Sequence, residues 1–166
     1  MKIEEKNDKL VITDFTEFEA YRIAEKIEKD GVDFYKRLAA KVVELQVKST
    51  LELLVSEEVR HLRIFEYLLS EVRKNGEDIS EDNDLLSSID FGIFQGLKRQ
   101  EELEKIITDT KKAIELAVVI ESKTVAFYEF CKNSVSAEKV KKELDRIISE
   151  EKNHRGLLQD LLKSIR

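Results

Sequence analysis

Apolar residues recur at intervals of three and four through most of this chain, and they fall into four long segments. The first runs from about Phe15 to Ala40, and the second starts after a break near Lys41–Glu44 and reaches about Lys74. The third runs from about Thr108 to Lys132, and the fourth from Ala137 to the end of the chain. Such intervals are typical of helices that bury one face. The pattern predicts four amphipathic helices.

Polar residues mark where these helices begin and end. Asp14, followed three residues later by Glu17, has the form of a capping box and predicts a helix start near Phe15. Asn75-Gly76 is a stop signal at the end of the second helix. Ser136 closes a polar break before the fourth helix and is its candidate N-cap.

The two halves of the chain repeat one another. A shift of 93 residues places residues 20–73 on residues 113–166 without a gap, and 18 of the 54 pairs are identical. Each half is therefore one helical hairpin. Residues 74–112 join the hairpins, and this crossover is long enough to return the chain along the bundle, so that the second and third helices run parallel.

These observations predict an all-α fold, a ferritin-like four-helix bundle made of two repeated hairpins joined by a long crossover. We expect the bundle to span residues 15–166 and residues 1–14 to form a loosely packed, charged N-terminal arm. Within the crossover, the apolar residues between Leu85 and Phe94 predict a short helix or packed loop over one face of the bundle.

Composition narrows the classes of protein to consider. The chain has 166 residues, no Pro, and a net charge of −6 with Lys and Arg interspersed among the acids, which argues against nucleic acid as a partner. The single cysteine, Cys131, excludes a disulfide framework within one chain and a four-cysteine metal module. No stretch is apolar enough to span a bilayer. We expect a cytoplasmic protein with no membrane partner.

The only two histidines end the same phrase, Glu58-Val59-Arg60-His61 in one half and Glu151-Lys152-Asn153-His154 in the other. On a helix, residues three apart lie on one face, about 4.5 Å apart along the axis, so that Glu and His at this spacing can bind one metal ion. The repeat adds an earlier glutamate in each half, Glu28 and Glu121, at equivalent positions on the apolar face. Four carboxylates and two imidazoles are thus predicted to face the core.

Burying that many acids is costly without a compensating charge. One unpaired buried carboxylate costs several kcal/mol, and four close together would also repel one another. Two divalent cations would offset the four negative charges, and carboxylate with imidazole is a donor set suited to iron or manganese, with zinc as an alternative. The pattern therefore predicts a site for two metal ions.

The segments Ile27–Tyr35 and Ile120–Tyr128, together with the two Glu-x-x-His phrases, resemble the rubrerythrin branch of the ferritin-like di-iron superfamily. The resemblance covers roughly residues 15 to 166. It implies two iron ions, with Mn or Zn as alternatives, and bridging roles for Glu58 and Glu151. It also implies that Tyr35 and Tyr128 donate hydrogen bonds to ligand carboxylates. The implied metal ligands are Glu28, Glu58, His61, Glu121, Glu151 and His154.

Some of the repeated residues also have interpretations that do not involve a metal site. Tyr35 and Tyr128 could be plain core aromatics. Glu57 and Glu150 also repeat, but they lie about 100° around the helix from the apolar stripe, which favours a solvated face or an outer salt bridge over metal ligation.

The sequence departs from rubrerythrins proper in two ways. Thr124 stands where they have a further ligand Glu, and one cysteine cannot build the rubredoxin-like module that usually supplies electrons. The six-residue set is closer to that of bacterioferritin. We predict a di-iron redox protein that reduces hydrogen peroxide with an external electron-donor protein and forms a homodimer. The alternatives are a ferroxidase or iron-handling protein, an O2-activating hydroxylase, and a bundle in which the metal is only structural.

Overall fold

The computed structural model describes residues 2–6, 9–14, 16–74 and 100–165. Its long helices are α1 (Glu17–Lys41), α2 (Leu45–Lys74), α5 (Thr110–Ser134) and α6 (Glu138–Ser164). They confirm the four helices that the apolar periodicity predicts. A short helix, α4 (Gln100–Ile107), precedes α5 and was not predicted.

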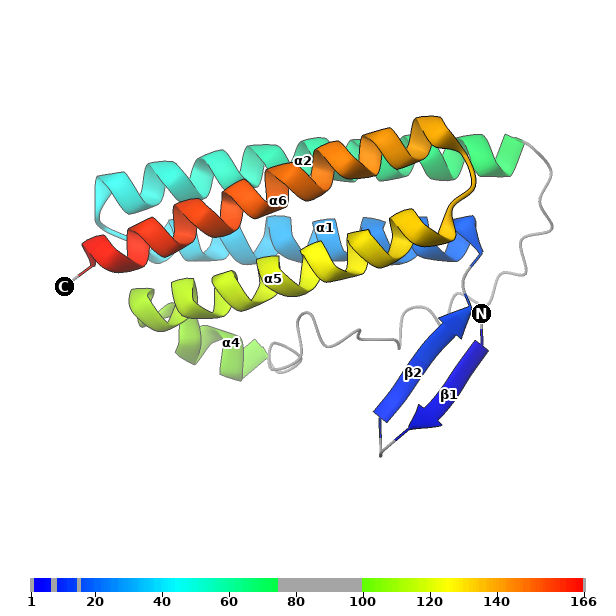
Figure 1. The fold of residues 1–166 in the computed structure, drawn as a ribbon. Helices are drawn as coiled ribbons and strands as arrows, with labels where there is room; N and C mark the ends of the chain where they lie inside the picture. Colours follow the sequence, from blue (N-terminus) through cyan, green and yellow to red (C-terminus); the bar gives the residue numbers. More distant parts are fainter. Residues whose placement is uncertain (1, 7–8, 15, 75–99, 166) are drawn as a thin grey trace.

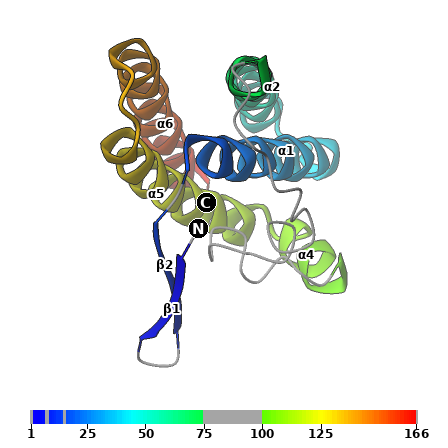
Figure 2. The ribbon, with the colours of Figure 1, turned by 90° about the vertical axis from the view of Figure 1, so that its right-hand side faces the viewer.

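The four long helices form a bundle of two antiparallel hairpins, α1 with α2 and α5 with α6 (Figure 1). Between the hairpins, α1 packs against α5 and α2 against α6, while α4 packs against α5 and α1 (Figure 2). Helices α2 and α5 run in the same direction in Figure 1, as the length of the crossover predicts. The predicted element between Leu85 and Phe94 lies outside the described residues.

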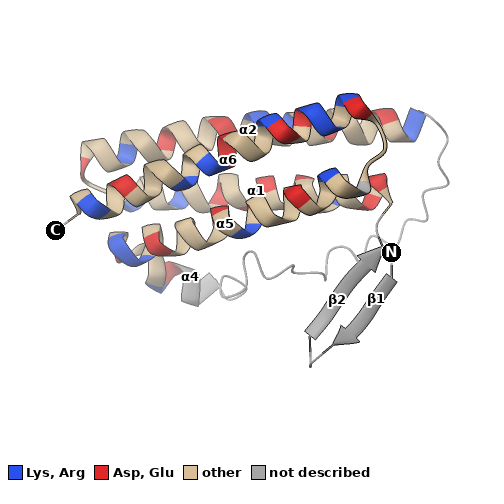
Figure 3. Ribbon diagram, viewed as in Figure 1, with Lys and Arg blue, Asp and Glu red and all other residues tan. Residues whose placement is uncertain are grey.

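The core follows the apolar stripes of the four helices. Leu51 and Leu54 of α2 are fully buried, as is Leu144 of α6, and Ile147 of α6 is 1% exposed. Residues of both charge signs alternate along the helices in Figure 3. Pairs such as Lys29 with Glu25 connect successive helical turns. Burial of the apolar faces against one another favours packing of the helices, while the charged faces stay in water. None of the described helices is long and apolar enough to cross a bilayer.

The predicted start of α1 is wrong by two residues. The N-cap is Thr16, whose hydroxyl accepts a hydrogen bond from the backbone N–H of Glu19 at 3.2 Å, while the Glu19 carboxylate accepts one from the backbone N–H of Thr16 at 2.9 Å. This is a capping box, but Asp14 takes no part in it. Asp14 is instead the last residue of a β-strand, so its backbone is extended and already paired.

Ser136 does not cap the last helix. The N-cap of α6 is Ala137, which offers no side-chain hydrogen bond. Ser136 instead donates from its backbone N–H and its hydroxyl to Oε1 of Glu17, at 3.0 and 3.3 Å. These bonds tie the turn between α5 and α6 to the start of α1.

The residues expected to form a loosely packed arm contain an antiparallel hairpin of β1 (Lys2–Lys6) and β2 (Lys9–Asp14). The Leu10-Val11-Ile12 run lies in β2, in keeping with the strand preference of β-branched residues. Among the described residues the hairpin packs against no helix, and in Figure 1 it stands apart from the bundle.

Candidate metal centre

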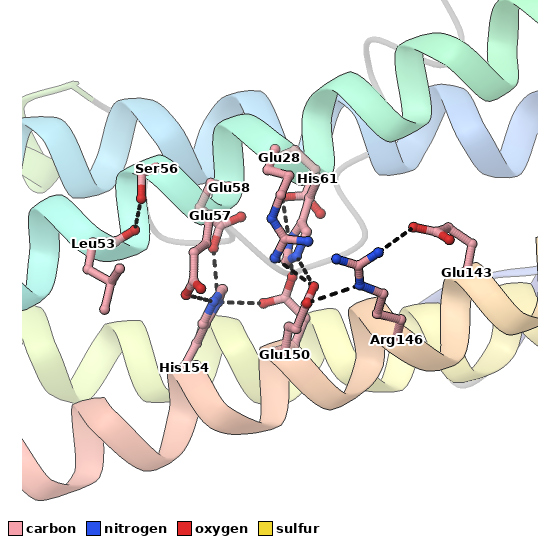
Figure 4. Close-up of polar contacts among 12 residues, drawn as sticks. Glu28, Leu53, Ser56, Glu57, Glu58, His61, Glu143, Arg146, Glu150 and His154 are labelled. Carbon is pink, nitrogen blue, oxygen red and sulfur yellow. Dashed lines mark hydrogen bonds and ion pairs between the residues drawn. The ribbon is translucent and has the colours of Figure 1, made fainter.

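The six residues predicted as metal ligands meet inside the bundle. Helix α1 supplies Glu28 and α5 supplies Glu121, whereas α2 and α6 each supply a Glu and a His. None of the six is more than 4% exposed. They lie within the apolar core because each continues the apolar stripe of its own helix. Figure 4 shows several of them between α2 and α6.

Their side chains form two overlapping groups, each with ligand atoms within 4.8 Å of one another. The first group contains Glu28 and His61, and the second contains Glu121 and His154. Glu58 and Glu151 belong to both groups. A carboxylate shared between two groups is in the place that a bridging ligand would occupy, so the geometry agrees with the predicted bridges. The metal-binding roles themselves stay predictions.

The imidazoles of His61 and His154 stack at 5.7 Å between ring centroids. Both turn Nδ1 toward the buried carboxylates of the ligand groups. Nδ1 of His61 lies 2.8 Å from Oε1 of Glu151, and Nδ1 of His154 lies 3.1 Å from Oε2 of the same residue. Nδ1 of His154 is also 3.4 Å from Oε1 of Glu58. Nδ1 is therefore the imidazole nitrogen that a metal ion at either position would meet.

The outer nitrogen of each imidazole faces a glutamate of the opposite hairpin. Nε2 of His61 lies 2.9 Å from Oε2 of Glu150, and Nε2 of His154 lies 2.7 Å from Oε2 of Glu57. An ionised carboxylate can only accept, so Nε2–H is the donor in both pairs, and Nδ1 is the nitrogen that can give up its proton to bind metal. The sequence favours a solvated face or an outer salt bridge for these glutamates. Their repetition beside each inner glutamate is a signal that both positions matter, but it does not identify the imidazoles as their partners.

Two buried tyrosines connect α1 and α5 across the centre. The hydroxyl of Tyr35 donates to Oε1 of Glu121, and the hydroxyl of Tyr128 donates to Oε1 of Glu28. Each tyrosine thus bonds the glutamate of the other hairpin. Burial, followed by the charge of the bonded glutamate, holds the pKa of both tyrosines well above 10, so both stay protonated donors.

Electrostatics shows what four buried acids cost. Burial and the neighbouring Glu58 raise the pKa of Glu28 well above 4.5, and burial with Glu151 does the same for Glu121. Burial opposes the charged form of His154, but hydrogen bonds to Glu151 and Glu58 outweigh it and raise the pKa of His154 to about 11. Without metal, the cluster therefore retains protons that its residues would lose in water.

The cluster fits a pair of metal ions. Among the described residues, Oε2 of Glu28, Oε1 of Glu151 and Nδ1 of His61 are buried and make no hydrogen bond of good geometry, although the last two lie 2.8 Å apart. Buried polar atoms left in this way are costly, and metal coordination would satisfy all three. Gly31 faces Glu58, and a Cβ there would lie 3.4 Å from Oε2 of Glu58, which is close to ordinary contact. The donor set is carboxylate and imidazole, which suits iron, manganese or zinc.

A helical bundle with one Glu from each of two helices and Glu-x-x-His from each of the other two belongs to the ferritin-like carboxylate class. The profile of the Rubrerythrin family matches residues 19–162, and the chain belongs to that family. The fold is similar to a crystal structure described as a ferritin-like diiron-carboxylate protein from Thermotoga maritima. The TM-score is 0.71 at 20% identity, over 92% of this chain and 98% of the other. No curated protein matches the chain.

Proposed function

We propose that this protein binds two iron ions at the carboxylate–histidine centre and reduces hydrogen peroxide with electrons from a separate donor protein. The observation that carries the proposal is the pair of overlapping ligand groups that share Glu58 and Glu151. Two ferrous ions bound there would supply the two electrons that, with two protons, convert one peroxide molecule to two waters. Membership of the Rubrerythrin family supports the choice of iron.

The residues divide into shared and separate roles. Glu58 and Glu151 would bridge the two positions, while Glu28 and His61 complete one and Glu121 and His154 complete the other. Four ionised carboxylates balance the four positive charges of two divalent ions, so the buried centre is neutral overall.

Tyr35 and Tyr128 hold the two unshared glutamates through their hydroxyl groups. They keep one oxygen of each carboxylate occupied, which leaves the other oxygen for metal. Because their pKa values are raised, both tyrosines remain donors through the pH range in which the protein would work.

Anaerobic loading with Fe(II), followed by separate mixing with peroxide and with O2, tests the proposal. We expect faster oxidation by peroxide, at one equivalent for two irons. His61→Ala and His154→Ala should each abolish turnover with helical content retained, whereas Tyr67→Phe, on an exposed face of α2, should change neither. Unaffected turnover in either histidine variant would refute the assignment.

Iron oxidation by O2 is the second candidate, and one observation favours it. Thr124, buried in α5, occupies the position of the additional glutamate of rubrerythrins, so the site retains only six ligand residues. Faster oxidation by O2 than by peroxide would support this alternative or hydroxylation of an organic substrate. A dimer in size-exclusion chromatography, which we propose as the assembly, would exclude storage in a hollow cage.

A further inference from the structure

The repeat breaks down around the two outer glutamates, Glu57 and Glu150. Glu150 forms an ion pair with Nη2 of Arg60 at 2.8 Å. It forms another with Nε of Arg146 at 3.4 Å (Figure 4). A shift of 93 residues places Arg60 on Asn153 and Arg146 on Leu53. Among the described residues Glu57 has no ion pair with a Lys or Arg. The two halves therefore differ by two guanidinium groups at otherwise equivalent positions.

Solvent does not remove this difference. The side chains of Glu57 and Glu150 are 31% and 22% exposed, so both are only partly hydrated. Arg60 is itself 36% exposed and reaches across from α2 to α6 to contact Glu150. Charges at such partly buried sites are screened less than those on an open surface.

The guanidinium groups act on the imidazoles through the outer glutamates. Glu150 divides its negative charge between His61 and two arginines. Glu57 pairs directly with His154, and Arg60 acts on it only through the longer-range attraction of its charge. A carboxylate that accepts the outer N–H of a ligand histidine raises the basicity of the inner nitrogen, and an undivided carboxylate does so more strongly. The positive charges near Glu150 also disfavour a cation at the His61 position. Both effects favour the His154 position.

We propose that the two metal positions are unequal, that the position of Glu121 and His154 fills first, and that Arg60 and Arg146 set this order. The inference rests on the proposed function in that both positions bind metal. Loss of an outer partner commonly changes metal affinity by about 10- to 100-fold, so we expect the two stepwise affinities to differ by about tenfold.

Cobalt(II) is a suitable probe because it can be located by anomalous scattering. Crystals of the protein equilibrated with one equivalent of Co(II) per chain should show higher occupancy at the His154 position. In solution, titration of the apoprotein with Co(II) against a competing chelator should give two separate binding constants. Neither measurement depends on turnover.

The repeat supplies matched variants. Arg60→Asn with Arg146→Leu gives Glu150 the surroundings that Glu57 has. The cobalt occupancies of the two metal positions should then become equal. Leu53→Arg with Asn153→Arg, added to that pair, should reverse the order. Arg146→Leu alone alters a side chain that is 60% exposed, so it should fold normally and reduce the difference in part.

Equal occupancy in the unaltered protein would overturn the inference, as would an order that the exchanged arginines do not change. Absence of cobalt from both positions would instead overturn the proposed function, and the inference with it. Preferred filling of the His154 position in the unaltered protein, and its loss in Arg60→Asn/Arg146→Leu, would establish the inference.

Discussion

The two helical hairpins are alike where they face each other and differ where they face outward. The α1–α2 and α5–α6 hairpins share their inner glutamates, histidines and tyrosines, and the first helix of each begins at an equivalent N-cap, Thr16 or Asp109. Outside the centre the equivalence is lost, as at Arg60 and Asn153. Chemistry at the centre therefore constrains both hairpins together, whereas each outer face is free to change separately.

The halves are also interdependent. Each ligand group draws residues from both hairpins, because Glu58 and Glu151 enter both groups. The tyrosines and outer glutamates cross in the same way, from one hairpin to the ligand of the other. Neither hairpin alone can complete a metal position.

The largest expected effect comes from removing a shared glutamate. Glu58→Gln or Glu151→Gln takes one negative oxygen from both groups, so we expect both metal ions to be lost. Glu28→Gln and Glu121→Gln affect one group each and should leave one ion bound. Metal analysis after equilibration with Mn(II) and gel filtration measures the ions retained per chain.

Glu66→Gln, on an exposed face of α2, is the control for this series and should retain two ions. If a shared glutamate and an unshared one gave the same loss, the bridging assignment would be wrong.

Metal should stabilise the bundle more strongly as pH rises. In the apoprotein the pKa values of Glu28, Glu121, His61 and His154 are raised, so the folded state holds more protons than the unfolded state near neutral pH. The lowered pKa values of Glu151 and Glu150 change stability only below about 4.5, where unfolded carboxylates take up protons, so they do not offset this trend at higher pH. Apoprotein stability should therefore fall as pH rises above about 4.5, by about 1.4 kcal/mol per pH unit for each additional proton held.

Metal ions replace these protons and bind better as pH rises. At a free concentration one hundred times Kd, the bound metal adds about 2.7 kcal/mol. Thermal unfolding of the apo and Mn(II)-loaded protein between pH 5 and pH 8 should show a widening gap in Tm. A gap that stays constant or narrows would contradict the protonation states described above.

Tyrosine substitutions should have a smaller and equal effect in the two halves. Tyr35→Phe leaves Oε1 of Glu121 without its donor, and Tyr128→Phe does the same to Glu28. Leaving a buried acceptor unsatisfied costs about 1–3 kcal/mol in the free energy of unfolding, which urea denaturation measures. Tyr67→Phe, at a half-exposed position, should change it little. A clear difference between the two buried tyrosines would show that the halves are unequal inside the centre as well.

The inner parts of the molecule could be predicted from sequence because they are repeated and periodic. Helical spacing located the four long helices, and the repeat brought Glu28 and Glu121 to the level of the histidines, where the structure places them. The contacts of the outer glutamates could not be predicted, since residues 100° from the stripe face either solvent or a neighbouring helix depending on how the helices are rotated. Helix rotation is set by packing across the bundle and not by local spacing.

Helix starts were the least predictable feature. Asp14-x-x-Glu17 and Thr16-x-x-Glu19 both have the form of a capping box, and only the pairing of Asp14 within β2 decides between them. Ser136 likewise has a suitable side chain for a cap, but it bonds Glu17 of the other hairpin. In both places a contact distant in sequence overrides a local pattern.

The smallest expected effect on the free energy of unfolding comes from substitutions at the helix N-caps. Thr16 and Asp109 cap α1 and α5, with Oδ1 of Asp109 accepting from the N–H of Lys112 at 3.1 Å, so Thr16→Ala and Asp109→Ala should each cost about 1 kcal/mol. Ala137 has the extended backbone of an N-cap, with φ −72° and ψ 116°, but no side-chain acceptor. Ala137→Asp should therefore gain about 1 kcal/mol in urea denaturation. A neutral or destabilising result would mean that the start of α6 depends on the Ser136–Glu17 contact rather than on its own cap.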